Sequence, residues 1–171
     1  MNTALAELFR HNLWANRRLL DLCAGLGDEL LDASTPGTFG RVHDTLQHIV
    51  DAEEGYLRRY LRSQQPRQSG SPTDDLPGIE ELRERASCSG NGLIEVAEQF
   101  QPGEVLQVPW DNGDVYDVPA VVFLVQAINH ATEHRAQVLT ILSQREIAVP
   151  DLSAWGYWED TNEPVNVHTS G

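Results

Sequence analysis

Apolar residues recur at three- and four-residue steps in four separate stretches of the chain, the pattern of helices with one buried face. The third stretch is the weakest helix, because its CSGNG segment is poor helix-forming sequence. The pattern predicts an all-α fold, a four-helix bundle. The predicted helices run from Thr3 to about Leu26, from about Arg41 to Ser63, from about Ile79 to Phe100, and from Pro119 or Ala120 to about Arg145.

The segments between these helices carry turn-forming residues. DASTPGTFG (32–40) and QQPRQSGSPTDDLPG (64–78) are polar and rich in Pro, Gly or Ser, so both are predicted to be loops. In VLQVPWDNGDVYDVP (105–119), apolar residues flank Asn112-Gly113, which is a strong hairpin turn signal. A short β-hairpin or an extended segment is therefore expected before the fourth helix, although Pro109 argues against a long strand.

The length of 171 residues suits one domain with one sizeable core. We expect that domain to span residues 1–160 and residues 161–171 to form a flexible tail. The aromatic residues Trp155, Tyr157 and Trp158 suggest that the segment before the tail packs over the helices.

The charge balance excludes several functions. The chain has 26 acidic and 12 basic residues, and every basic residue is arginine. Without lysine, a Schiff-base mechanism and a P-loop are excluded. The net charge of −14 repels phosphate backbones, so no nucleic-acid partner is expected. The sequence has no apolar run long enough to span a membrane, no signal peptide and only two cysteines, so we expect a soluble, cytoplasmic protein without a membrane partner.

Candidate chemistry lies on the fourth helix, where His130 and His134 are four residues apart and leave the same helix face. Two imidazoles at this spacing can bind one metal ion. The spacing alone is weak evidence, because six histidines in a chain of this length give such a pair by chance roughly one time in six. The pair is stronger because both residues lie on the apolar stripe of the helix, where neutral imidazoles need hydrogen-bond partners or a metal.

A third histidine, His48, flanks the apolar face of the second helix and would join the pair if the second and fourth helices are neighbours. Three imidazoles with an open fourth position are typical of a catalytic metal site. The alternative is that the three are ordinary core or surface histidines. The other histidines, His11, His43 and His168, are predicted to be incidental.

Three segments resemble the DinB-like family of small bacterial proteins: HNLWANRRLLDLC (11–23), FGRVHDTLQHIVDAEEGYLRR (39–59) and INHATEHRAQVLTIL (128–142). The resemblance covers about residues 4–158. It implies a four-helix bundle with a long crossover between the second and third helices, and metal ligands at His48, His130 and His134. Members are usually described as candidate metal-dependent enzymes, commonly with zinc or nickel, and often form homodimers. Relatives include bacillithiol-dependent thiol S-transferases and a mycothiol-dependent isomerase.

Three functions remain open at this stage. The resemblance favours an enzyme that transfers a low-molecular-weight thiol, as cosubstrate, to a small electrophilic substrate. The open three-histidine site would also suit a metal-dependent hydrolase, for which Asp44, Asp51 and Glu133 are candidate general bases. Each of these carboxylates is more simply a solvated or arginine-paired surface group. The third possibility is a non-catalytic binding or stress-response protein that its metal stabilises. Arg135 points about 140° away from His130 on the helix and is assigned no role.

Overall fold

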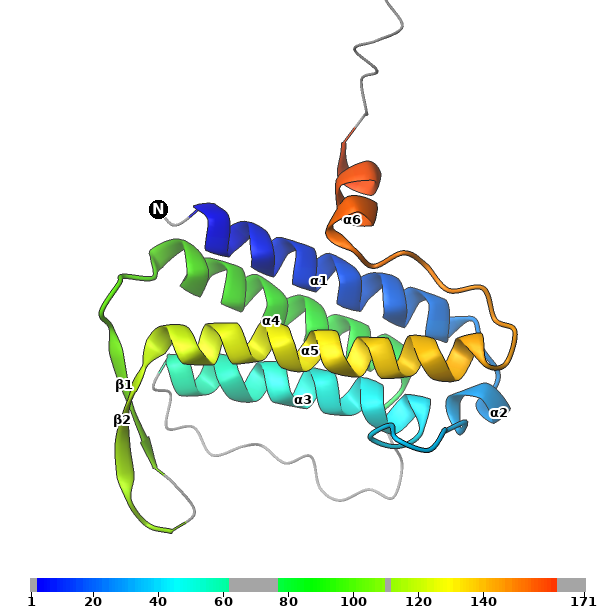
Figure 1. Cartoon of the computed structure of the whole chain (residues 1–171), viewed down its shortest axis with the longest axis horizontal. Coiled ribbons are helices and arrows are strands. Elements are labelled where there is room, and N and C mark those ends of the chain that lie inside the picture. Colours follow the sequence, from blue (N-terminus) through cyan, green and yellow to red (C-terminus); the bar gives the residue numbers. More distant parts are fainter. Residues whose placement is uncertain (1–2, 62–76, 110–111, 163–171) are drawn as a thin grey trace, which may run out of the picture.

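A computed structural model describes residues 3–61, 77–109 and 112–162, which are mostly helical with a small antiparallel sheet (Figure 1). All four predicted helices and the predicted hairpin are present. Their first and last residues lie within a few residues of the predicted positions. Two short helices, residues 28–31 and 154–161, were not predicted. The elements are α1 (Thr3–Ala24), α2 (Asp28–Leu31), α3 (Val42–Tyr60), α4 (Ile79–Gln99), β1 (Val105–Pro109), β2 (Val115–Pro119), α5 (Ala120–Ser143) and α6 (Ala154–Thr161).

The four long helices lie side by side, each in contact with two of the others. α1 packs against α4 and α5, and α3 packs against the same two helices. Figure 1 shows that α3 and α4 run in the same direction, opposite to α1 and α5. Most of the chain that joins α3 to α4, residues 62–76, lies outside the described residues. The predicted second and fourth helices, α3 and α5, are therefore direct neighbours.

The glycines of α4 do not interrupt the helix, contrary to the weakness expected there. A Cβ atom at Gly90 would lie 2.6 Å from a side-chain carbon of Leu13 on α1. A Cβ atom at Gly92 would lie equally close, 2.6 Å, to a side-chain carbon of Leu57 on α3. Tertiary packing thus outweighs the low helix propensity, because these glycines let α4 approach both neighbours closely.

The hairpin between α4 and α5 confirms the Asn-Gly turn signal. β1 and β2 pair antiparallel, with Val105 opposite Pro119 and Pro109 opposite Val115. Gly113 has a φ of 88°, a backbone conformation that is unfavourable for residues with a side chain and that glycine adopts freely. Leu106 and Val108 are buried and join the core at the N-terminal end of α5.

The core consists of two apolar clusters at opposite ends of the long helices. One contains Phe9, Leu93 and Leu124, and the other contains Leu19, Leu46 and Ile141. α1, α4 and α5 contribute buried residues to both clusters, whereas α3 contributes buried residues to the second cluster and only partly buried side chains to the first. Most of the polar residues described below come from the stretches of these helices between their two apolar sets; His48 is the exception, because it lies between Leu46 and Val50 of the second cluster. A polar layer therefore divides the core.

Beyond α5, the chain turns back to place α6 against α1 (Figure 1). The Tyr157 hydroxyl donates a hydrogen bond to Glu7 of α1, so this aromatic packs on the helices as expected. Trp155 does not, since 76% of its surface is exposed. Most of the predicted tail, residues 163–171 including His168, lies outside the described residues.

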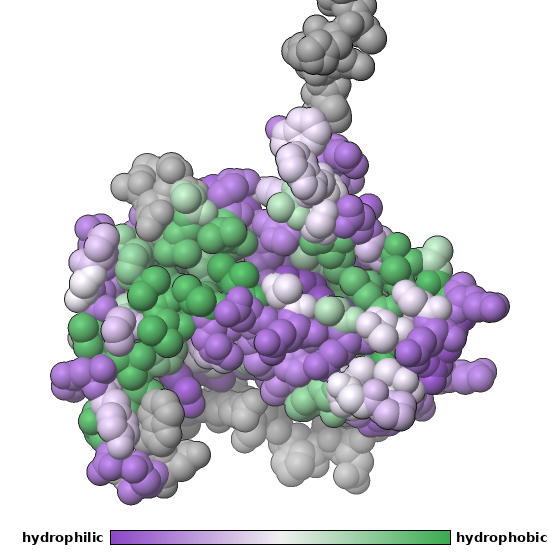
Figure 2. Space-filling view, viewed as in Figure 1, coloured by the Kyte–Doolittle hydropathy of each residue, from purple (hydrophilic) through white to green (hydrophobic). Residues whose placement is uncertain are grey.

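On the face in Figure 2, apolar side chains gather near the ends where α1 and α5 begin, and a second apolar area lies below and to the right of α6. The exposed apolar residues of the described segments include Leu8 of α1 and Val121, Val122 and Val125 of α5. Polar side chains lie between the two areas. Within the described segments, no helix combines the length and apolarity needed to cross a membrane.

Candidate metal centre

His48 of α3 and the pair His130 and His134 of α5 come together between the two helices. One ring nitrogen from each histidine lies within 4.8 Å of the others. The Nε2 atoms of His48 and His130 are 3.0 Å apart. The two α5 histidines are one helical turn apart, so their rings leave the same helix face and meet edge to face, with centroids 4.5 Å apart. The packing of α3 on α5 brings His48 to them.

The nitrogen donors fit a divalent transition metal. Two nitrogens on one tetrahedral zinc ion lie about 3.3 Å apart, close to the spacing of His48 and His130. Burial and the neighbouring histidines lower the pKa of His130 to about 4, and burial lowers the pKa of His48. Both rings are therefore neutral near pH 7 and keep a lone pair for a ligand. Imidazole donors suit zinc and nickel among the common biological metals.

Two residues that sequence reasoning missed contact this cluster. Gln137 lies one turn after His134, and its Oε1 atom is 3.1 Å from His134 Nδ1. The Phe39 ring stacks on His48, with centroids 4.1 Å apart and planes 11° from parallel. The i,i+3 spacing from His134 could have drawn attention to Gln137. Nothing in the sequence indicates that the loop before α3 reaches the cluster.

None of the three carboxylates considered as general bases belongs to the histidine cluster, although the charge of Asp51 opposes the lowering of the pKa of His48. Asp44 accepts hydrogen bonds from Arg41 at 2.7 and 2.8 Å, and this interaction lowers the pKa of Asp44. Asp51 accepts a hydrogen bond from Arg85 at 2.6 Å. Glu133 is exposed on α5. Among the described residues, the group with metal-binding spacing contains histidines alone.

Two further histidines are engaged elsewhere. His11 Nε2 is 2.9 Å from the backbone oxygen of Leu152, and its ring packs against Trp14. His43 Nε2 is 2.9 Å from the backbone oxygen of Pro77, so it anchors the segment that leads into α4. These contacts agree with the expectation that both residues are incidental to a metal site.

A second polar cluster lies in the same layer and involves all four long helices. Glu53 of α3 is completely buried, and its Oε1 accepts hydrogen bonds from Asn12 at 2.6 Å and Asn16 at 2.8 Å on α1. The oxygens of both asparagines accept from Arg135 Nη1 of α5, each at 2.7 Å. Ser89 of α4 donates to the other oxygen of Glu53 at 3.4 Å. We call these five residues the buried network.

The charges of the buried network compensate each other through the asparagines. Burial raises the pKa of Glu53, and the asparagine hydrogen bonds and Arg135 oppose that rise. Burial also lowers the pKa of Arg135 to about 10, which leaves it protonated at neutral pH. The guanidinium of Arg135 donates to the oxygen of each asparagine, and the nitrogen of each asparagine donates to the carboxylate of Glu53. Each hydrogen bond in this chain therefore has one donor and one acceptor, all in the same order.

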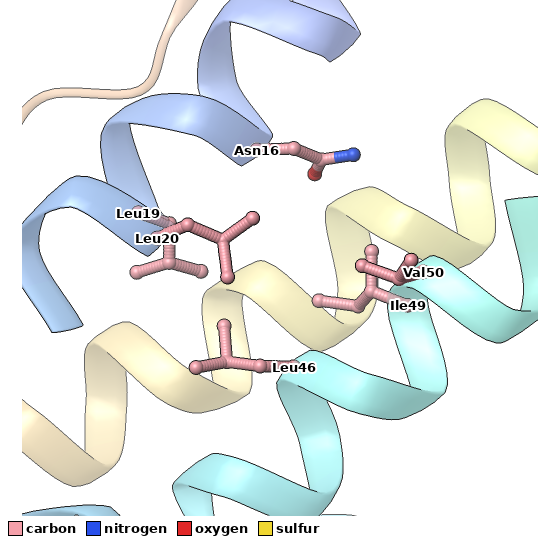
Figure 3. A pocket seen from close by; sticks show the side chains of 6 residues that line it. All are labelled: Asn16, Leu19, Leu20, Leu46, Ile49 and Val50. Atoms are coloured by element: carbon pink, nitrogen blue, oxygen red, sulfur yellow. The ribbon is translucent and has the colours of Figure 1, made fainter. Parts of the chain in front are cut away.

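A small pocket between α1 and α3 adjoins the buried network through Asn16 (Figure 3). Its other lining residues are leucines, isoleucine and valine, which Figure 3 shows on α1 and α3. The cavity volume of about 10 Å³ accommodates at most one water molecule. A substrate therefore has no room there.

Fold and site together define a helical protein with a cluster of three histidines at metal-binding distance. The family model described as DinB family matches residues 1–160, so this chain belongs to the DinB family. It is similar to Protein DinB of Bacillus subtilis (strain 168), with 19% identity over 152 residues that cover 81% of this chain and 84% of that protein. The resemblance found in the sequence is thereby confirmed, and the histidine cluster is compatible with metal binding.

Proposed function

We propose that His48, His130 and His134 bind one divalent transition metal ion, zinc or nickel. The observation that carries this proposal is the meeting of three ring nitrogens from two helices within 4.8 Å. The lowered pKa values of His48 and His130 support it, because metal ligation requires neutral imidazoles. So does the approach of His48 Nε2 and His130 Nε2 to 3.0 Å, because one ion between them would bind the lone pairs of both rings.

The test is metal content in protein isolated without an affinity tag, because a polyhistidine tag brings nickel with it. We expect close to one metal ion per chain. The variant His130→Ala/His134→Ala should stay helical by circular dichroism and lose stoichiometric metal. The control His11→Ala removes an imidazole away from the cluster and should retain the metal. Undiminished metal in the double variant would contradict the assignment.

For the activity, we propose transfer of a low-molecular-weight thiol to a small electrophile. A bound metal ion would supply the Lewis acidity that keeps a thiol deprotonated at neutral pH. In the reaction the thiol sulfur bonds to the electrophilic carbon, the leaving group departs with its electron pair, and the thiol proton passes to solvent. The relatives of the DinB-like family include bacillithiol-dependent thiol S-transferases, which supports this reaction.

The pairing of the carboxylates favours thiol transfer over hydrolysis. A hydrolase needs a general base close to the attacking water. Asp44 and Asp51 are held by arginines, and no carboxylate belongs to the histidine cluster in the described part of the chain. A thiolate needs no such base once it has lost its proton.

Conjugation of monochlorobimane with bacillithiol, mycothiol, glutathione and coenzyme A tests the activity. At least one thiol should show metal-dependent conjugation above the uncatalysed rate, and the His130→Ala/His134→Ala variant should abolish it. If every thiol fails while the protein binds metal, the transferase proposal is wrong and the metal proposal stands. Metal-dependent ester hydrolysis in the same preparation would then favour the hydrolase.

We also propose that the four long helices form a four-helix bundle with a crossover between α3 and α4. Support comes from the ring of contacts among them and from the common direction of α3 and α4 (Figure 1).

A further inference from the structure

The side-chain amide of Gln137 lies between a histidine of the cluster and the loop that precedes α3. Its Oε1 atom accepts the backbone N–H of Phe39 at 2.9 Å and faces His134 Nδ1 at 3.1 Å. The Phe39 ring in turn stacks on His48 and meets the edge of His134, 5.2 Å between centroids. One amide group thus links the loop, one histidine of α5 and, through the Phe39 ring, the histidine of α3.

The backbone contact fixes which end of the amide faces His134. A backbone N–H can only donate, so the Gln137 atom near Phe39 must be the oxygen. Because the same oxygen faces His134, Nδ1 of that ring must carry the proton. A neutral imidazole has one N–H and one lone pair, so the lone pair of His134 is on Nε2. The two hydrogen bonds therefore select both the tautomer and the ring orientation.

We propose that Gln137 is a positioning residue for the metal site: it holds His134 in the tautomer that presents Nε2 to the ion, and it ties the Phe39 loop to that ligand. This inference rests on the proposed metal binding. Outer-shell hydrogen bonds of this kind orient ligating histidines and raise their basicity, and their loss weakens metal affinity 10- to 100-fold. Neither effect requires Gln137 to touch the ion or a substrate.

Zinc affinity, measured by competition with a chromophoric chelator, tests this role. Gln137→Ala should raise the Kd for zinc about 10- to 100-fold. Gln137→Glu should bind zinc at least as tightly as the wild type, because a carboxylate accepts both hydrogen bonds and adds charge assistance. This rescue would not follow from a merely structural role of the side chain, because it requires an acceptor beside His134.

Gln144→Ala is the matched control. Gln144 follows the last residue of the same helix and accepts a hydrogen bond from the Thr35 hydroxyl of the same loop at 2.8 Å, away from the three histidines. Its removal loosens the loop without touching a ligand, so the Kd for zinc should change less than twofold. Thermal unfolding of each metal-free variant shows whether a change in affinity reflects lost folding.

The outcomes separate the two proposals. A wild-type protein that binds no zinc overturns the proposed metal site and this inference with it. A wild-type protein that binds zinc, with an unchanged Kd in Gln137→Ala, overturns the inference alone. An equal loss of affinity in Gln137→Ala and Gln144→Ala also overturns it, because the effect would then belong to the loop.

Discussion

The polar layer between the two apolar clusters contains two groups of different character. In the buried network, Glu53, Asn12, Asn16 and Arg135 satisfy one another through oriented hydrogen bonds. In the histidine cluster, two Nε2 atoms face each other at 3.0 Å, and His130 Nδ1 is buried without a partner. Both groups contain residues of α3 and α5. The packing of these two helices therefore produces one group whose hydrogen bonds are satisfied and one group with a buried nitrogen that has no partner.

The difference indicates which group serves the fold and which serves a ligand. A satisfied buried network adds specificity to helix packing, whereas an unsatisfied polar group costs about 1–3 kcal/mol. A metal ion would bind the Nε2 lone pairs of His48 and His130 together, whereas a hydrogen bond between the two rings uses only one of them. We accordingly expect changes in the buried network to act on stability, and changes in the histidine cluster to act on metal binding.

The largest effect should follow the loss of Arg135. Arg135→Met leaves Glu53 as an unpaired charge in the core and removes the donor to Asn12 and Asn16. We expect the free energy of unfolding to fall by about 3–5 kcal/mol, the usual cost of leaving a buried charge without its counter-charge. Urea denaturation of the metal-free protein, followed by circular dichroism, measures the change.

The companion variant is Glu53→Gln in the Arg135→Met background, which removes the charge left unpaired. It should recover part of the lost stability, as coupled residues do in a double-mutant cycle. Glu53→Gln alone completes the cycle. If the loss of stability in the double variant equals the sum of the losses in Arg135→Met and Glu53→Gln, the asparagines do not couple Glu53 to Arg135.

A smaller, ligand-dependent effect is expected from the histidine cluster. Zinc at 100 times its Kd should raise the free energy of unfolding of the wild type by about 2.7 kcal/mol, because it binds only the folded state. His130→Ala/His134→Ala should show no such increase. Differential scanning calorimetry with and without zinc checks this. Equal stabilisation of both proteins would mean that zinc binds elsewhere.

The sequence predicted what depends on local periodicity. Apolar spacing located the four long helices, Asn112-Gly113 located the hairpin turn, and the i,i+4 pair located His130 and His134. It did not predict that Gly90 would be compatible with a continuous helix, because the reason is the approach of Leu13 from α1.

The contacts that depend on tertiary packing were missed. The helical spacing predicted that Arg135 points about 140° away from His130, but this angle does not identify the residues that Arg135 contacts. Its role depends on Asn12 and Asn16 of α1, more than a hundred residues earlier in the chain. Gln137 has its importance only because Phe39, in a loop, folds back onto α5. Neither contact produces a periodic pattern that could be recognised in the sequence.

The smallest effect concerns His130 in the absence of metal. His130→Leu removes a buried Nδ1 atom without a partner, and it also removes the hydrogen bond between the Nε2 atoms of His130 and His48. Because the two effects oppose each other, we expect the free energy of unfolding of the metal-free protein to change by less than about 1 kcal/mol. Urea denaturation in the presence of a chelator measures it. A matched change in the buried network, Asn16→Leu, should instead destabilise, because it strips partners from Glu53 and Arg135. If His130→Leu destabilises the metal-free protein as much as Asn16→Leu, the histidine cluster contributes to the fold in its own right, and the division between the two groups is wrong.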